Sequence, residues 1–229
     1  MIQSINHFKP RAGARIGVLA MIKNILFDTE GVLLDFSPEA ILRRLKVPEE
    51  DIPLLREAVF RSPERISLQR DGITLEKAVD TIAAALPLGL RSWAGLALAD
   101  WWKYPLDPVP GMAELMGELK DLGFKLYLFA NADRAIHAYA HRIPGAKYFD
   151  GLFASSDWKL LKPEPAIYDA LLDSLGLTSW ECLLIDAVPA NVDGARRVDM
   201  DAVLFRGDTA RLRRELNAQG VGVKGTDQG

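Results

Sequence analysis

The sequence has few of the features that mark secreted, membrane-spanning or nucleic-acid-binding proteins. Its 229 residues include one cysteine, Cys182, which excludes a disulfide framework and favours a reducing compartment, so we expect the cytoplasm. No apolar run approaches the ~20 residues that a membrane-spanning helix needs. Basic and acidic residues nearly balance, 28 against 31, which leaves no electrostatic footprint for nucleic acid or an anionic membrane. These absences favour a globular protein that acts on neither nucleic acid nor membranes.

The chain contains enough apolar material for a full core. Hydrophobic residues make up 49% of it, and a chain of this length buries roughly 70% or more of the surface that its unfolded form exposes. Whether Met1 or Met21 is the natural start stays open. The expected units are a flexible leader (1–20), a core (21–36 and 105–219), a helical insertion (37–104) and a flexible, glycine-rich tail (220–229).

Strand and helix patterns alternate along the core. Short apolar runs predict strands, and apolar residues three and four positions apart predict amphipathic helices. Such alternation implies an α/β fold with a parallel sheet covered by helices on both faces. The expected strands begin near residue 25 and then cover 124–130, 151–155, 182–186 and 202–205. The expected helices cover 38–45, 50–60, 74–86, 90–103, 112–122, 134–141, 166–175, 190–198 and 209–218.

Polar residues end three of the predicted strands, and a lysine stands alone in a fourth loop. The first strand ends on Asp28, with Glu30 two positions later, and another strand ends next to Asn131. A third ends on Asp186, and Lys162 lies just before two prolines that open a helix. The carboxyl ends of parallel strands form the edge at which open α/β folds bind their ligands. Asp28 is therefore the first candidate for chemistry.

The ordered set of acid, asparagine, lysine and acid in four loops resembles the four motifs of the haloacid dehalogenase superfamily of hydrolases. The resemblance covers roughly residues 22–205. It implies a Rossmann-like core with a helical cap inserted between the first and second motifs. It also implies an aspartyl nucleophile, Mg²⁺ and, for most members, hydrolysis of small phosphate esters. We therefore expect a phosphoric monoester hydrolase whose partner is a small-molecule phosphate ester.

The resemblance further implies a role for each motif residue. Asp28 attacks phosphorus to form an aspartyl-phosphate, and Glu30 protonates the leaving group. Lys162 and Mg²⁺ neutralise the charge of the transition state, and Asn131 holds the phosphoryl oxygens. The expected metal ligands are Asp28, Glu30 and Asp186, with the main-chain carbonyl of residue 30 among them.

Three positions depart from the motifs of that superfamily. Ala130 stands where a serine or threonine usually precedes the asparagine, and Glu30 stands where the phosphatases usually carry aspartate. Counting back from Asn191, Ala187 occupies the position of the acid that binds the metal directly, and Asp186 that of its neighbour. The departures weaken the expected metal site. They leave open an alternative, a catalytically degenerate member that acts as a ligand-binding or interaction protein.

Two other kinds of chemistry rank lower. The dehalogenase branch of the superfamily works without metal, but its serine-rich fourth motif is not matched by residues 186–188. His137 and His141 share one helix face but lack a third ligand, so an exposed helix face is expected rather than a metal site.

Three further groups of residues have ordinary structural interpretations. Acids outside the motifs are expected as helix caps or surface charges: Asp133, Asp157 and Asp193. Tryptophans of the insertion are expected to pack its helices together: Trp93, Trp101 and Trp102. Polar residues of the insertion include candidates for contact with a substrate anion, but a solvated face is favoured for them: Arg61, Arg65, Gln69 and Arg70.

Overall fold

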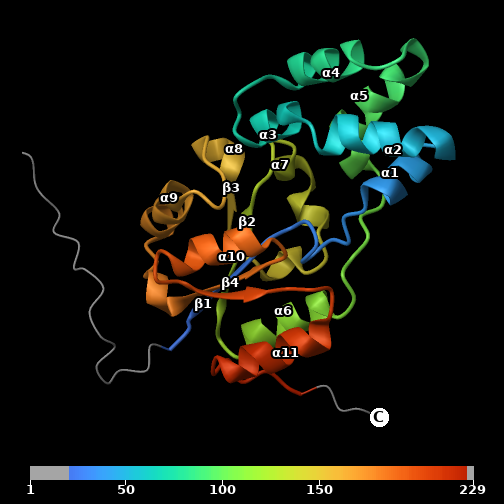
Figure 1. The fold of residues 1–229 in the computed structure, drawn as a ribbon. Helices are drawn as coiled ribbons and strands as arrows, with labels where there is room; N and C mark the ends of the chain where they lie inside the picture. Colours follow the sequence, from blue (N-terminus) through green and yellow to red (C-terminus); the bar gives the residue numbers. More distant parts are fainter. Residues whose placement is uncertain (1–20, 226–229) are drawn as a thin grey trace, which may run out of the picture.

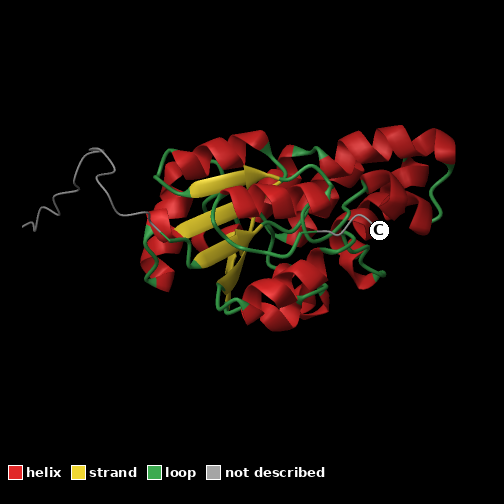
Figure 2. Cartoon of the chain, turned by 90° about the horizontal axis from the view of Figure 1, so that it is seen from below, coloured by secondary structure: helices red, strands yellow, loops and turns green. Residues whose placement is uncertain are grey.

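A five-stranded parallel β-sheet forms the centre of the molecule in the computed structural model, which describes residues 21–225 (Figures 1 and 2). In the order of the sheet, the strands are β3 (Gly151–Ala154), β2 (Lys125–Ala130), β1 (Asn24–Phe27), β4 (Cys182–Asp186) and β5 (Asp201–Leu204). The central strand β1 pairs with β2 on one side and with β4 on the other. The expected α/β fold with a parallel sheet is confirmed.

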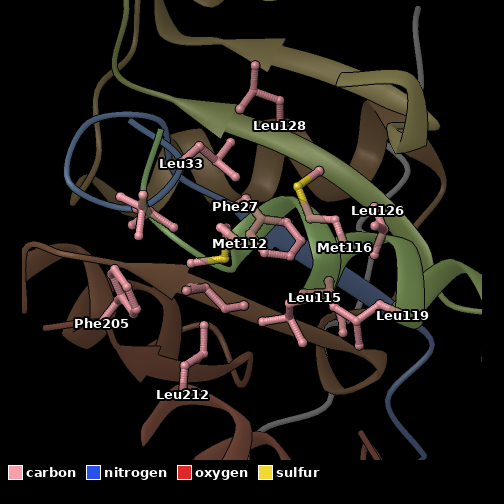
Figure 3. Packing of buried hydrophobic residues seen from close by; sticks show 14 of the residues in the cluster. Phe27, Leu33, Met112, Leu115, Met116, Leu119, Leu126, Leu128, Phe205 and Leu212 are labelled. Carbon is pink, nitrogen blue, oxygen red and sulfur yellow. The ribbon is translucent and has the colours of Figure 1, made fainter. Parts of the chain in front are cut away.

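Helices cover both faces of the sheet. Because successive side chains of a strand point to opposite faces, Ile25 and Phe27 face one layer and Leu26 faces the other. Leu115 and Leu212 belong to the same cluster as Phe27 (Figure 3). Burial of each large apolar side chain contributes roughly 1.5–3 kcal/mol, so the two layers hold the sheet firmly. The layers are α6 (Met112–Asp121) with α11 (Thr209–Ala218), and α9 (Pro165–Leu175) with α10 (Pro189–Arg196).

Between β1 and β2 the chain forms a helical insert with a hydrophobic cluster of its own. Ser37, Ser62 and Thr74 begin three of its helices, because each side chain accepts a hydrogen bond from a backbone N–H of the first turn. The apolar faces of the helices meet around Leu42 and Leu55. Figure 1 shows the insert at one end of the molecule. Its helices are α1 (Pro38–Arg44), α2 (Ile52–Leu55), α3 (Pro63–Gln69), α4 (Leu75–Ala84) and α5 (Arg91–Ala99).

Short helical turns complete the fold and account for most differences from the sequence-based expectation. The helices expected at 50–60 and 134–141 are broken into shorter pieces, and α3 was not expected at all. Leu68 is the only buried residue of α3, so this helix lacks the apolar stripe that periodicity detects. The short elements are η1 (Glu49–Asp51), the π-type η2 (Arg56–Phe60), η3 (Leu88–Leu90), η4 (Trp101–Lys103), α7 (Ile136–Tyr139), η5 (Ala140–Arg142), η6 (Ala146–Tyr148), α8 (Ser155–Trp158) and η7 (Ser179–Glu181).

The C-terminal segment packs against the core, contrary to the expected flexible tail. Val221 and Val223 are each 4% exposed, and the Asn217 side chain donates a hydrogen bond of 2.8 Å to the Val223 carbonyl. Glycines suggested flexibility here, but two apolar side chains find room beside α11. The expected leader, 1–20, and residues 226–229 lie outside the described residues. Over residues 21–225, no helix combines the length and apolarity needed to cross a membrane.

Candidate active site

Polar side chains from three neighbouring strands meet at the carboxyl edge of the sheet. Asp28 follows β1, Asn131 follows β2, and Asp186 is the last residue of β4. Because these strands are adjacent and parallel, their carboxyl ends lie side by side. Asp28 therefore stands between the other two residues.

Lys162 joins this group from the loop between α8 and α9. Its Nζ donates hydrogen bonds to Asp28 Oδ1 at 2.9 Å, to Asp186 Oδ2 at 2.7 Å and to the Phe129 carbonyl at 2.8 Å. The expected contact between Lys162 and Asp28 is thus present. All three ammonium donors have an acceptor, which a lysine side chain that is 0% exposed requires.

Asn131 holds the loop that carries Lys162. Its side-chain amide donates to the Lys162 carbonyl at 3.0 Å, and its carbonyl oxygen accepts from the Lys162 backbone N–H at 2.9 Å. The expectation for Asn131 was contact with phosphoryl oxygens. In the structure its amide group positions the loop of Lys162, and the phosphoryl contact stays a prediction.

Asp186 is held by Asn191, a residue that the sequence placed in the fourth motif without a role. The Asn191 amide lies 3.1 Å from both oxygens of Asp186, and the Val188 backbone N–H donates to Oδ1 at 2.8 Å. Asn191 lies in the first turns of α10, so the helix that follows β4 aims its side chain back at the strand end. Tyr168 in turn fixes Asn191 by donating to its carbonyl at 2.7 Å.

The packing of α10 against the Lys162 loop gives a first testable prediction. A Cβ on Gly194 would lie 2.7 Å from Tyr168 Oη and 3.0 Å from the Pro163 carbonyl. We expect Gly194→Ala to destabilise the fold by about 1–3 kcal/mol, because overpacking displaces the loop. Urea unfolding measures the change, with Gly89→Ala as control, since a Cβ on Gly89 meets nothing within 4 Å. Equal stability of the two variants would contradict the tight contact.

Burial and neighbouring charges set the ionisation of Asp28 and Lys162. Desolvation raises the pKa of the Asp28 carboxyl to about 7, because the charge of Lys162 lowers it less than burial and Asp186 together raise it. Burial also disfavours a charged Lys162, but the charges of Asp28 and Asp186 outweigh it and raise the pKa of the ammonium. Lys162 is therefore a cation at neutral pH.

The Glu30 side chain is paired with a residue of the insert. Its Oε1 accepts a hydrogen bond of 2.5 Å from Arg65 Nη2 in α3, and the Arg65 guanidinium lies 5.1 Å from the centre of the Phe36 ring. The Arg65 side chain is only 19% exposed, so its expected place on a solvated face is wrong. No sequence pattern links these two residues, which are 35 positions apart.

The insert leaves little space directly over Glu30. A cavity of about 20 Å³ lies there, lined in part by Arg65, Asp133 and Tyr139, with room for about one water molecule. A cleft of about 310 Å³ adjoins the cavity, since Leu98 and Asp133 line both. Its volume falls at the lower end of the range for small-molecule sites. Space for a ligand therefore lies in the cleft between insert and core.

Polar contacts close the insert onto the core around this cleft. The Gln69 carbonyl accepts a hydrogen bond of 2.7 Å from Ser155 Oγ, and Arg70 forms an ion pair with Glu164. The Gln69 contact is made by its main chain, and the paired Arg70 side chain stays 40% exposed, so neither contact excludes the solvated face expected for these residues. Arg61 agrees with that expectation, with a side chain that is 67% exposed.

A lysine between two aspartates on the carboxyl edge of a parallel sheet agrees with the pattern of one hydrolase family. The profile of haloacid dehalogenase-like hydrolases matches residues 22–199, a span that includes Asp28, Lys162 and Asp186. The chain belongs to the haloacid dehalogenase-like hydrolases. The resemblance seen in the four sequence motifs is thereby confirmed.

Individual relatives of this family are distant. Phosphatase MT3486 of Mycobacterium tuberculosis is 24% identical over 199 residues, which cover 80% of this chain and 87% of that protein. The enzyme bt-2542 of Bacteroides thetaiotaomicron, solved with magnesium and inorganic phosphate, has a TM-score of 0.61 at 21% identity, covering 83% of this chain and 98% of its own. L-2-haloacid dehalogenase of Xanthobacter autotrophicus has a TM-score of 0.61 at 18% identity, covering 89% and 85%. The two structures show that the fold is shared.

Two of the three carboxylates expected to bind magnesium are engaged by other groups in this structure. Glu30 is held by Arg65, and both oxygens of Asp186 already accept hydrogen bonds. The side chain of Ala187 contributes no oxygen beside them. Within residues 21–225, no three acidic, histidine or cysteine side chains group in a way that could hold a metal ion. The side chains around Asp28 therefore do not fit a resident Mg²⁺, which prefers near-octahedral oxygen coordination.

The tryptophans of the insert divide into two groups. Trp93 packs within the insert, as expected, and donates a hydrogen bond of 3.2 Å to the Leu45 carbonyl. Trp101 also packs against the cluster of the insert, as expected. In addition, Trp101 and Trp102 contact Tyr139 of the core, with ring centres 5.4 and 6.0 Å from the Tyr139 ring. Because Tyr139 lines the small cavity, these two rings attach the end of the insert to the site.

The remaining candidates lie mostly at the surface. His137 and His141 are exposed, and His137 Nε2 lies 2.9 Å from Asp157 Oδ1, so the expected exposed face agrees with the structure. Asp193 has a side chain that is 59% exposed. Asp133 differs, because it accepts a hydrogen bond from a backbone N–H, as a cap does, and also lines both the cavity and the cleft. Burial raises the pKa of the Asp133 carboxyl.

Proposed function

We propose that the protein is a phosphoric monoester hydrolase that acts on a small phosphorylated metabolite through Asp28. The observation that carries the proposal is the buried Lys162 ammonium, which holds Asp28 and Asp186 together at the edge of the sheet. An aspartate oriented in this way has the position of a nucleophile. The cleft that adjoins the small cavity at Glu30 has room for a small molecule between insert and core. The similarity to phosphatase MT3486 supports a phosphate ester as the substrate class.

The proposed reaction has two steps. An oxygen of Asp28 attacks phosphorus, the bond from phosphorus to the ester oxygen breaks, and the Glu30 carboxyl, once released from Arg65, acts as the general acid that gives a proton to the departing alcohol. Water then attacks the aspartyl-phosphate, Glu30 takes a proton from that water, and Asp28 is released with inorganic phosphate. Lys162 stays bonded to the carboxylate and limits its rotation, which favours attack from one orientation.

Arg65 is the proposed contact for the substrate anion. In the structure its guanidinium is bound to Glu30. A phosphoryl group carries more negative charge than a carboxylate and offers a planar guanidinium two oxygens at once. It would therefore compete for Arg65 and release Glu30 for proton transfer. Since the cavity at Arg65 holds only about 20 Å³, the insert must move away to admit the substrate.

Replacement of Arg65 gives a prediction specific to this role. Arg65→Met is expected to raise KM for an aryl phosphate by roughly tenfold or more, because a charge-assisted hydrogen bond is worth about 1.5–3 kcal/mol. Steady-state kinetics measure the effect. The matched control is Arg61→Met, whose side chain lies at the surface and should leave KM unchanged. An unchanged KM in the Arg65 variant would remove the arginine from substrate binding.

The direct test of the function is hydrolysis of a generic aryl phosphate and a panel of small phosphate esters. The assay runs both with EDTA and with Mg²⁺, because the site does not fit a resident metal. We expect release of inorganic phosphate that requires Asp28. If no ester is hydrolysed under either condition, the proposal fails and a ligand-binding role becomes the better account.

Displacement at carbon is the second candidate. It is favoured by one observation, the lack of an assembled set of metal ligands, because the dehalogenase branch works without metal. An aspartate that attacks a halogenated carbon gives an ester and releases halide, and water then hydrolyses the ester. Halide release from 2-haloacids, measured beside phosphate release, separates the two candidates.

A further inference from the structure

Residue 187 faces the loop that carries Asp28. The Cβ of Ala187 lies 3.1 Å from the place where a Cβ on Gly31 would stand. Gly31 has a φ of +76°, which turns the chain sharply just after Asp28 and Glu30. A carboxylate at position 187 would therefore start from a Cβ that lies against the turn that follows Asp28 and Glu30. A methyl group supplies no ligand there.

Asp186 is not available as a substitute ligand. Its side chain is 0% exposed, and its two oxygens share four hydrogen bonds. The donors are Lys162, Asn191 and the backbone N–H of Val188. Turning toward a metal would leave at least one buried donor without an acceptor, which is costly.

As long as no substrate is bound, Glu30 is kept from a resident metal by its contact with Arg65 of the insert. The guanidinium of Arg65 holds its carboxylate at 2.5 Å and lies against the rings of Phe36 and Phe60. Stacking on two rings fixes the arginine, so the glutamate is directed at the insert. Of the three acids expected to bind metal, only Asp28 remains.

We propose that this chain works without a resident divalent cation and that Ala187 is the residue that prevents Mg²⁺ from binding. Lys162 supplies the positive charge at Asp28, and Arg65 supplies it for the anionic group of the substrate. The inference rests on the proposed function for the nature of the site. Its test does not, because the test measures metal binding.

The experiment is a calorimetric titration of the full chain with MgCl₂. The natural chain is expected to show no saturable binding in the millimolar range. Ala187→Asp is expected to bind Mg²⁺ at least about tenfold more tightly, since even partners behind the ligands change metal affinity by 10–100-fold. The matched control is Val188→Asp, which adds the same charge one position further on, at a side chain that is exposed. It should behave like the natural chain.

Two results of these titrations would overturn the inference. Saturable Mg²⁺ binding by the natural chain that Asp28→Asn abolishes would overturn it. A folded Ala187→Asp variant that gains no affinity over the Val188→Asp control would also overturn it. If Ala187→Asp fails to fold, the titration of the natural chain still decides whether a divalent cation binds.

Turnover separates this inference from the proposed function. Phosphatase activity that requires Mg²⁺ would overturn the inference and leave the proposed function standing. Activity that is the same in EDTA and Mg²⁺ supports both. No activity under either condition, together with new Mg²⁺ binding by Ala187→Asp, would remove the phosphatase and keep the inference.

Discussion

Asp28→Asn is expected to lower phosphatase turnover by roughly a thousandfold or more, because a neutral amide does not replace the carboxylate nucleophile. Asp28 is the acid that Lys162 holds at the end of β1. Steady-state hydrolysis of an aryl phosphate measures the loss. The control is Asp193→Asn, a surface position in α10 that should leave turnover unchanged. Retention of most activity by the Asp28 variant would exclude this residue as the nucleophile.

Asp28→Asn is also expected to change how the stability of the fold depends on pH. Burial raises the pKa of Asp28 from 3.8 to about 7 in the folded chain. Between these two values the unfolded chain releases a proton that the folded chain keeps, so the contribution of Asp28 to stability falls as pH rises. At pH 8 the ionised carboxylate opposes folding, and asparagine removes that charge. Urea unfolding at pH 5 and pH 8 should therefore show a smaller decrease with pH in Asp28→Asn than in the natural chain.

Lys162→Met is expected to have the largest effect on stability of any single substitution at the site. It leaves Asp28 and Asp186 buried without their cation, and breaking a buried ion pair in this way costs about 3–5 kcal/mol. For a chain of this size, 1 kcal/mol shifts the melting temperature by about 2–4 °C, so a decrease of roughly 6–20 °C is expected. Thermal unfolding followed by circular dichroism measures it.

Two controls make this prediction specific to the buried charge. Lys159→Met removes a cation from the same loop at a side chain that is 71% exposed, and its effect should stay within about 0.5 kcal/mol. The double variant Lys162→Met with Asp28→Asn removes one of the two uncompensated carboxylates. It should recover part of the lost stability, because contacting residues are not additive. Failure of the double variant to recover any would show that lost packing, not charge, explains the loss.

The sequence by itself determined the class of the fold and pointed to the polar residues that meet at the edge of the sheet. Apolar runs of strand length alternate with amphipathic helices, and this local pattern is sufficient for a parallel sheet covered on both faces. Asp28, Lys162 and Asp186 were visible because polar residues at the ends of buried strands and before helix-opening prolines interrupt that pattern. Such signals are local, so they survive without any knowledge of the packing.

The tertiary structure alone decided which groups are free to react. The strand order β3-β2-β1-β4-β5 brings Asp28 and Asp186 to one lysine, and packing of the insert brings Arg65 to Glu30. A carboxylate can act as a metal ligand, as a nucleophile or as the partner of an arginine. Its role depends on the hydrogen-bond donors that elements distant in sequence bring to it. Helix periodicity specifies an apolar face but not the neighbour that the opposite face meets. For that physical reason, the sequence could not show that Glu30 pairs with Arg65 or that both oxygens of Asp186 accept hydrogen bonds.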